Sequence, residues 1–264
     1  MYPLIEIGPF ALSSGGLFLL LAAIVGGWLT TRIAQSRGDA RFVSHAESCY
    51  YTALLGATIG GRLWYGLFHP ELYGLHPGLY FALRVEAFAW PGALLGGLAT
   101  GWLWTRWRGA PFLPLADAIA LALPISLIIG SIGLLLSGEA FGTPTSLPWA
   151  IDLFGTTRHP TQIYLMLAGL LSLIILHWLS TKPLPDGALL MALLGLQGIT
   201  MLVIEAWRGD SLLLPGGIRA AQIAGLTLMI AALLWARRHV MTHPQPAPTH
   251  ESYATVEITP FNDS

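Results

Sequence analysis

Seven side chains of this sequence are of types that can bind an anionic group and move a proton next to it. They are Arg62, Glu139, Arg158, His159, Gln162, Glu205 and Arg208. Guanidinium groups bind phosphate and carboxylate oxygens through paired hydrogen bonds. Histidine is the side chain that most readily exchanges a proton near neutral pH. These residue types therefore favour the binding of an anion with proton transfer beside it.

The composition indicates what kind of molecule must position these residues. The chain of 264 residues has 13 basic and 14 acidic side chains, so charged residues make up 10% of it, against about 25% in a soluble domain. Hydrophobic residues make up 54%, and the mean hydropathy is +0.63. This composition is typical of a polytopic membrane protein. The net charge of -1, without any cluster of basic residues, excludes nucleic acid as a partner.

Seven apolar windows are long enough to cross a membrane, because a transmembrane helix needs roughly 20 mostly apolar residues. The windows are 12–31, 49–68, 88–105, 115–136, 162–179, 188–207 and 220–236. The sequence therefore predicts an all-α, polytopic membrane protein with seven transmembrane helices. We expect the first helix to be retained, since the N-terminal residues lack the basic segment and the cleavage site of a removable signal peptide.

The basic residues predict the orientation, because cytoplasmic loops are enriched in lysine and arginine. One set of connections carries Arg32, Arg37, Arg41, Arg106, Arg108, Lys182, Arg237 and Arg238. The other set carries Arg84, Arg158 and Arg208, with Arg219 at its edge. We therefore expect the N-terminus outside and the C-terminus in the cytoplasm. Residues 1–240 form the predicted transmembrane domain, and the proline-rich residues 241–264 form a predicted disordered cytoplasmic tail.

The depth of the polar residues bears on function, since ionisable groups are costly in hydrocarbon. In this topology nearly all of them gather at the external leaflet. Gln197 alone lies near the midplane, where a transporter would place its key groups. Asp117, near the cytoplasmic start of its span, is expected to cap its helix or to reach toward water. A one-sided cluster favours a site for an anionic lipid head group and disfavours a small permease.

Each candidate residue also has a structural interpretation. Arg62 and Glu205 could form a pair that packs two helices. Arg208, at a span end, could extend its guanidinium to the interface. His159 could be an interfacial histidine without a chemical role, and Glu139 could be a solvated loop carboxylate. The residue types alone leave these alternatives open.

Other patterns predict packing and not chemistry. Pairs of glycines four positions apart predict close helix crossings: Gly56/Gly60, Gly92/Gly96 and Gly97/Gly101. Trp149 and Trp207 are expected to belong to the interfacial aromatic belt. The sequence has no motif typical of zinc hydrolases, phosphate-binding loops, dinucleotide sites or serine hydrolases. Its single cysteine, Cys49, excludes disulfides and cysteine-based metal sites, so we expect no cofactor and no metal.

Residues 129–151, IGSIGLLLSGEAFGTPTSLPWAI, are followed by RHPTQIY at 158–164. Together they resemble the prolipoprotein diacylglyceryl transferases of bacteria. The family pattern is like I-G-R-x-G-N-F-x-N-x-E-x-x-G, then P-T-x-x-P-W, then R-H-P-[ST]-Q-x-Y. Gly61-Arg62-Leu63 and Glu205-Ala206-Trp207-Arg208 resemble two further family motifs. The resemblance covers residues from about 5 to 236, and R-H-P-T-Q-x-Y at this spacing is its most specific part.

The resemblance implies a membrane enzyme of the bacterial inner membrane. Such an enzyme transfers the diacylglyceryl group of phosphatidylglycerol to the lipobox cysteine of a lipoprotein precursor and releases glycerol phosphate. Phosphatidylglycerol and lipoprotein precursors would then be its partners. Carried onto this chain, the resemblance assigns catalytic roles to His159, Glu139 and Arg208. It assigns substrate binding to Arg62, Arg158, Gln162, Tyr164 and Glu205.

The chain also departs from the family pattern. Pro91 stands where the family has the histidine of H-G-G-x-x-G, and Ser131 stands where it has the arginine of G-R-x-G-N. Leu134 and Ser137 replace two asparagines, and Gly15 occupies what looks like a tyrosine position. These replacements favour an alternative function, that of a catalytically inactive lipid-binding paralogue. A small permease is the less favoured third possibility.

Overall fold

The computed structural model describes residues 4–7, 10–74, 78, 89–211, 213–214 and 216–242. Seven long helices occupy most of this part of the chain. They are α1 (Ser14–Gln35), α2 (Ala40–Leu67), α4 (Trp90–Arg108), α5 (Phe112–Ser137), α6 (Thr161–Ser180), α7 (Ala188–Ile204) and α8 (Ala220–Thr242). The all-α prediction is confirmed. Arg84 lies outside the described residues, and so do residues 243–264, which make up most of the predicted tail.

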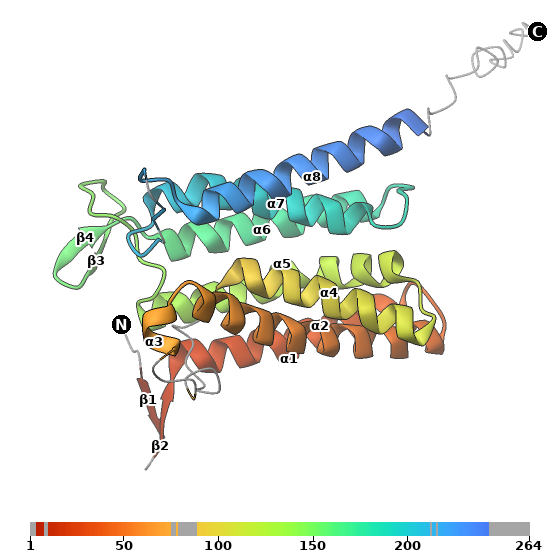
Figure 1. Cartoon of the computed structure of the whole chain (residues 1–264), viewed down its shortest axis with the longest axis horizontal. Coiled ribbons are helices and arrows are strands. Elements are labelled where there is room, and N and C mark those ends of the chain that lie inside the picture. The colour runs from red at the N-terminus through yellow and green to blue at the C-terminus, as the bar shows by residue number, and fades with distance from the viewer. Residues whose placement is uncertain are drawn as a thin grey trace, which may run out of the picture.

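Short elements cluster at one end of the helices (Figure 1). They are the hairpin β1 (Leu4–Ile7) and β2 (Phe10–Ser13), the short helix α3 (Pro70–Tyr73), and the hairpin β3 (Ile151–Leu153) and β4 (Thr156–Arg158). A 3-10 turn, η2 (Glu205–Trp207), ends α7 at the same end. In the predicted topology this is the external end of the molecule.

Figure 1 shows the helices in two layers, with α1, α2, α4 and α5 in one and α6, α7 and α8 in the other. Five of the helices, α1, α5, α6, α7 (extended to Trp207) and α8, are long and apolar enough to cross a membrane. Large apolar side chains such as Leu20, Leu55, Leu103 and Leu233 are exposed on the outside of the helices. The protein is therefore a multi-pass membrane protein. The path of all seven helices through the bilayer remains a prediction.

The two layers are joined by an apolar core near the predicted cytoplasmic ends of the helices. Its buried residues come from α5, α6 and α7: Ala116, Ala120, Leu176, Leu189, Leu190, Leu193 and Leu194. Leu98 of α4 packs against this core. Asp117, 5% exposed, accepts hydrogen bonds from the backbone N–H groups of Gly187 (2.7 Å) and Leu190 (2.8 Å). It does cap a helix, but the capped helix is α7 and not its own, and it does not reach toward water.

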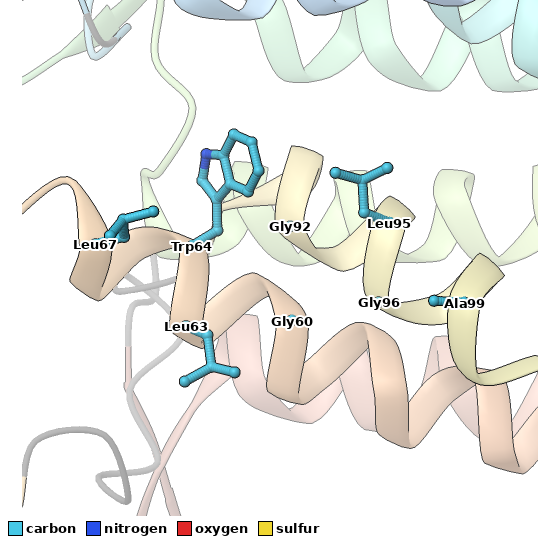
Figure 2. Close-up of a pocket in the computed structure, with 8 residues that line it drawn as sticks. All are labelled: Gly60, Leu63, Trp64, Leu67, Gly92, Leu95, Gly96 and Ala99. Carbon is cyan, nitrogen blue, oxygen red and sulfur yellow. The ribbon is translucent and has the colours of Figure 1, made fainter.

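The close crossing predicted from the glycine pairs is confirmed between α2 and α4. A Cβ atom on Gly60 would lie 2.3 Å from the Gly92 carbonyl oxygen, and one on Gly96 would lie 2.2 Å from the Gly56 carbonyl oxygen. Since both obstacles are backbone atoms, only glycine allows the helices to approach this closely. Figure 2 shows the apolar groove of about 570 Å³ beside the crossing, with Trp64 and Leu95 projecting to one side of it.

Candidate functional site

Two connections that are far apart in the sequence meet at the end that is external in the predicted topology. The first joins α5 to α6, and the second follows α7. The Thr143 N–H donates to the Trp207 carbonyl (2.7 Å), and the Gly209 N–H donates to the Phe141 carbonyl (2.8 Å). Gly142 and Arg208 lie opposite each other in this antiparallel bridge. The backbone therefore brings the segment of Glu139, Arg158 and His159 against the segment of Glu205 and Arg208.

Arg208 is held between two carboxylates. Its Nε donates to Asp210 (2.9 Å), and its Nη1 donates to Glu205 (3.4 Å), whose side chain is only 4% exposed. Burial lowers the pKa of Arg208, but the hydrogen bond and charge of Asp210 and the charge of Glu205 outweigh burial and raise that pKa above its usual value. The Arg219 guanidinium donates to the Arg208 carbonyl (2.6 Å). Arg208 is therefore a fixed and permanent cation.

Arg158 is held differently, because its contacts are with carbonyls and a ring. Its Nε donates to the Leu153 carbonyl and its Nη1 to the Gly142 carbonyl, both at 3.3 Å. The guanidinium lies over the Phe141 ring, 5.1 Å from its centroid. Within the described ranges, no carboxylate forms an ion pair with Arg158. These contacts use two of the five N–H donors of the Arg158 guanidinium. The other three donors make no hydrogen bond to the described residues, and Arg158 contacts Gly142, the residue that lies opposite Arg208.

His159 is fixed inside an aromatic cluster formed with Trp149, Tyr164 and Trp207. The His159 ring stacks on Trp207 with 5.9 Å between centroids and 24° between planes. Its Nδ1 lies 3.3 Å from the Tyr164 hydroxyl, which accepts a hydrogen bond from Trp149 Nε1 (2.9 Å). Trp149 and Trp207, expected in the interfacial belt, thus also hold the site together. Trp149 belongs to the P-T-x-x-P-W motif and Trp207 precedes Arg208, but neither position indicates this role in the sequence.

Gln162 and Glu139 are linked through the backbone. Gln162 is fully buried, and its Nε2 donates to the Glu139 carbonyl (2.7 Å), while the Thr161 hydroxyl donates to the Ala140 carbonyl. Gly138 and Ala140 both have positive φ, 80° and 52°. The first turn of α6 therefore holds a tight turn after α5. This geometry makes Gln162 a support of the loop, although its Oε1 accepts no hydrogen bond from the described residues.

The remaining motif positions lie on α1, α2, α4 and α5. Arg62 lies in α2 next to Gly61, whose carbonyl accepts a hydrogen bond from the Ala89 N–H (3.1 Å), so the start of α4 with Pro91 lies beside it. The Ser131 hydroxyl is buried and donates to the Leu127 carbonyl of its own helix. A Cβ on Gly15 would lie 3.4 Å from the Glu139 carboxylate, so Glu139 packs against the start of α1.

In the described part of the chain, no group of three histidine, cysteine, aspartate or glutamate side chains is arranged to hold a metal ion. The arrangement instead offers two arginines, a histidine and a tyrosine within a network of backbone and aromatic contacts. Such a site can bind an oxyanion and exchange a proton with a bound molecule.

Comparison with known proteins gives a consistent result. The chain matches the family model described as prolipoprotein diacylglyceryl transferase over residues 3–237. Relatives from Bordetella avium (strain 197N) and Cupriavidus pinatubonensis are each 33% identical, covering 87% and 95% of this chain and 91% and 96% of the relatives. A relative from Trichormus variabilis is 32% identical, covering 92% of this chain and 91% of the relative. All three are named phosphatidylglycerol–prolipoprotein diacylglyceryl transferase. The chain therefore belongs to the prolipoprotein diacylglyceryl transferase family.

Proposed function

We propose that this protein transfers the diacylglyceryl group of phosphatidylglycerol to the lipobox cysteine thiol of a lipoprotein precursor. The reaction releases glycerol phosphate and takes place at the external face of the bacterial inner membrane. The observation that carries the proposal is the pair of arginines at the external end. Arg158, without a carboxylate partner in the described ranges, lies across the Gly142 bridge from Arg208. A cation without a carboxylate partner, next to an arginine that two carboxylates orient, suits a phosphodiester head group.

The arginines have distinct proposed roles. Arg158 and Arg62 bind the phosphate of phosphatidylglycerol. Arg208, oriented by Glu205 and Asp210, stabilises the negative charge that grows on the leaving glycerol phosphate. Because its orientation is fixed before the substrate binds, little reorganisation is needed during the reaction.

The other site residues position the loop or exchange a proton. Glu139 and Gln162 hold the turn between α5 and α6 in place through the Gln162–Glu139 hydrogen bond. His159, held by Trp207 and Tyr164, is proposed to exchange a proton with the reactants. Tyr164 is proposed to orient the His159 ring and to line the substrate site.

A catalytically inactive lipid-binding paralogue is the second candidate. The observation that favours it is the loss of polar groups where the family pattern has them, at Pro91, Ser131 and Leu134. The Ser131 hydroxyl in particular donates its hydrogen bond to a backbone carbonyl of its own helix. A permease is disfavoured, because the apolar core of α5, α6 and α7 fills the half of the molecule that would have to open to the cytoplasm.

Complementation of a bacterial strain depleted of its own transferase separates these candidates. We expect the wild-type chain to restore growth, and Arg158→Ala, Arg208→Ala and His159→Ala to fail. Arg106→Ala, at the other end of α4, is the matched control and should restore growth. Membrane levels of every variant are measured by immunoblot.

The outcomes have separate meanings. Failure of the wild-type chain at normal membrane levels would contradict the transferase function and support the inactive paralogue. Growth with Arg158→Ala and Arg208→Ala would instead contradict the roles proposed for these two arginines, while the transferase activity itself would still be supported.

A further inference from the structure

A second histidine, His69, lies at the external end of α2. It lies two residues after the end of that helix and directly precedes Pro70 of α3, at the same end of the molecule as the β3–β4 hairpin (Figure 1). Its ring stacks on Tyr65 with 4.1 Å between centroids and 11° between planes. Tyr65 in turn meets Tyr73, which is 3% exposed, edge to face at 6.1 Å. The imidazole is half-buried and therefore held in one orientation.

The hydrogen bond of His69 determines which ring nitrogen carries the proton. His69 Nδ1 lies 2.9 Å from the Tyr65 backbone carbonyl oxygen. A carbonyl oxygen can only accept, so Nδ1 must be the donor and must carry the hydrogen. In the neutral ring the lone pair is then on Nε2. Nε2 makes no hydrogen bond with any residue that the structure describes. His69 thus presents a free proton acceptor.

His159 favours the opposite arrangement. Its Nδ1 faces the Tyr164 hydroxyl, and that oxygen already accepts the Trp149 Nε1–H. The hydroxyl proton of Tyr164 can then be donated to His159 Nδ1, which places the imidazole proton of the neutral ring on Nε2. In this state Nε2 is a donor. His159 can therefore donate a hydrogen bond or a proton from Nε2, whereas His69 can accept a proton at Nε2.

Arg62 and Tyr65, three positions apart in α2, share a face of that helix. His69 lies two residues beyond the end of α2, and its stacking on Tyr65 places its ring on the side of the helix that carries Arg62. Among the residues that the structure describes, the charged and titratable groups near His69 in the chain are Arg62 and Tyr65 on α2, and Glu71 and Tyr73 on α3. The adjacent first turn of α4, 90–93, contributes none.

We propose that His69 is the base that accepts the thiol proton in this protein, an assignment that rests on the proposed transferase function. The S–H proton passes to His69 Nε2, and the sulfur attacks the diacylglyceryl carbon bonded to the phosphate oxygen. A C–S bond forms and the C–O bond breaks. The electron pair leaves with glycerol phosphate, whose charge is bound by Arg158 and Arg208. His159 donates a hydrogen bond from Nε2 to the leaving phosphate and keeps its proton, and His69 later releases the thiol proton to water.

The test uses the purified full-length protein in phosphatidylglycerol micelles with a cysteine-containing precursor peptide, and measures glycerol phosphate release. His69→Asn keeps an amide donor for the Tyr65 carbonyl but removes the base. We expect its kcat to fall by about a hundredfold or more, with little change in KM for phosphatidylglycerol. Added imidazole should restore part of the activity of His69→Ala. His45→Asn, near the other end of α2 and more than about 30 Å away, is the control and should behave as wild type.

Each outcome decides the assignment. Wild-type kcat in His69→Asn overturns it. Loss of activity in His69→Ala that imidazole does not restore indicates a structural role and also overturns it. Imidazole rescue of His159→Ala, but not of His69→Ala, moves the base to His159. An inactive wild-type protein contradicts the proposed transferase function itself, which separates that failure from the failure of this assignment.

Discussion

Arg158 and Arg208 differ in how their positive charges are balanced. Arg208 donates to two carboxylates, Glu205 and Asp210, whereas the donors of Arg158 meet backbone carbonyls and its charge lies over a ring. Arg208 is thus oriented before any ligand binds. Arg158 has no carboxylate counterion among the residues that the structure describes. A substrate phosphate placed between them would gain from both features.

Replacing Arg208 by lysine tests the importance of its forked geometry. Lysine keeps the charge but cannot donate to Asp210 and Glu205 from two fixed nitrogens. We expect kcat/KM to fall about ten- to a hundredfold, the effect of losing one hydrogen bond to a charged group. Since the pKa of Arg208 is raised, the arginine stays protonated at high pH, and the loss should be equal at pH 6 and pH 9.

Glycerol phosphate release by purified variants measures this effect. Arg106→Lys, at the opposite end of α4, is the matched control and should keep wild-type kcat/KM. A wild-type value for Arg208→Lys would show that charge alone is sufficient at this position.

At the scale of elements, short connections do most of the positioning. The α5–α6 connection forms a backbone bridge with the segment after α7, in which Gly142 lies opposite Arg208. A Cβ on Gly142 would lie 2.3 Å from the His159 carbonyl oxygen, so no larger residue fits there without moving His159. At the other end of α7, Asp117 caps the helix from α5. Helix α7 is thus fixed to α5 at one end and to the site at the other.

Removing the Asp117 carboxylate should weaken this attachment. In Asp117→Ala, the N–H groups of Gly187 and Leu190 lose their acceptor in a buried place. We expect a loss of about 0.5–2 kcal/mol in the free energy of unfolding, the usual cost of losing a helix cap. Thermal unfolding in detergent measures it. Asp186→Ala removes an exposed carboxylate from the same connection and should change stability by less than about 0.5 kcal/mol.

At the scale of the whole molecule, the two ends of the helices have different characters. The end near the starts of α5 and α7 is closed by the leucine-rich core. The opposite end carries the hairpins and α3 (Figure 1). The two arginines and both histidines discussed above lie in or next to the short elements β4, η2 and α3 at that end. This polarity suits a site that takes a lipid from one leaflet and a protein segment from the same side. It does not suit a path through the membrane.

Cysteine labelling tests the predicted orientation. The single native cysteine, Cys49, is 1% exposed and should not react, so the wild-type protein supplies a clean background. Asp152 and Lys182 are both exposed, at opposite ends of α6. We expect a membrane-impermeant maleimide to label Asp152→Cys in intact spheroplasts, and Lys182→Cys only after permeabilisation. The reverse pattern would place the site in the cytoplasm.

The sequence by itself determined the helical class and the family. Long apolar segments must form helices in a bilayer, because a helix satisfies its backbone hydrogen bonds internally. The close crossing of α2 and α4 was also predictable, since paired glycines at this spacing leave no side chain between two backbones. The motif residues Arg158, His159 and Arg208 were visible for a similar reason. Their types and spacing are local properties.

Only the tertiary structure decided which of these residues act together and how each is oriented. The pairing of Gly142 with Arg208, the stacking of Trp207 on His159 and the capping of α7 by Asp117 all join segments far apart in the chain. The proton positions on His69 and His159 also followed from their neighbours, a carbonyl in one case and a hydroxyl in the other. Such contacts depend on how helices pack, and residue order does not specify packing.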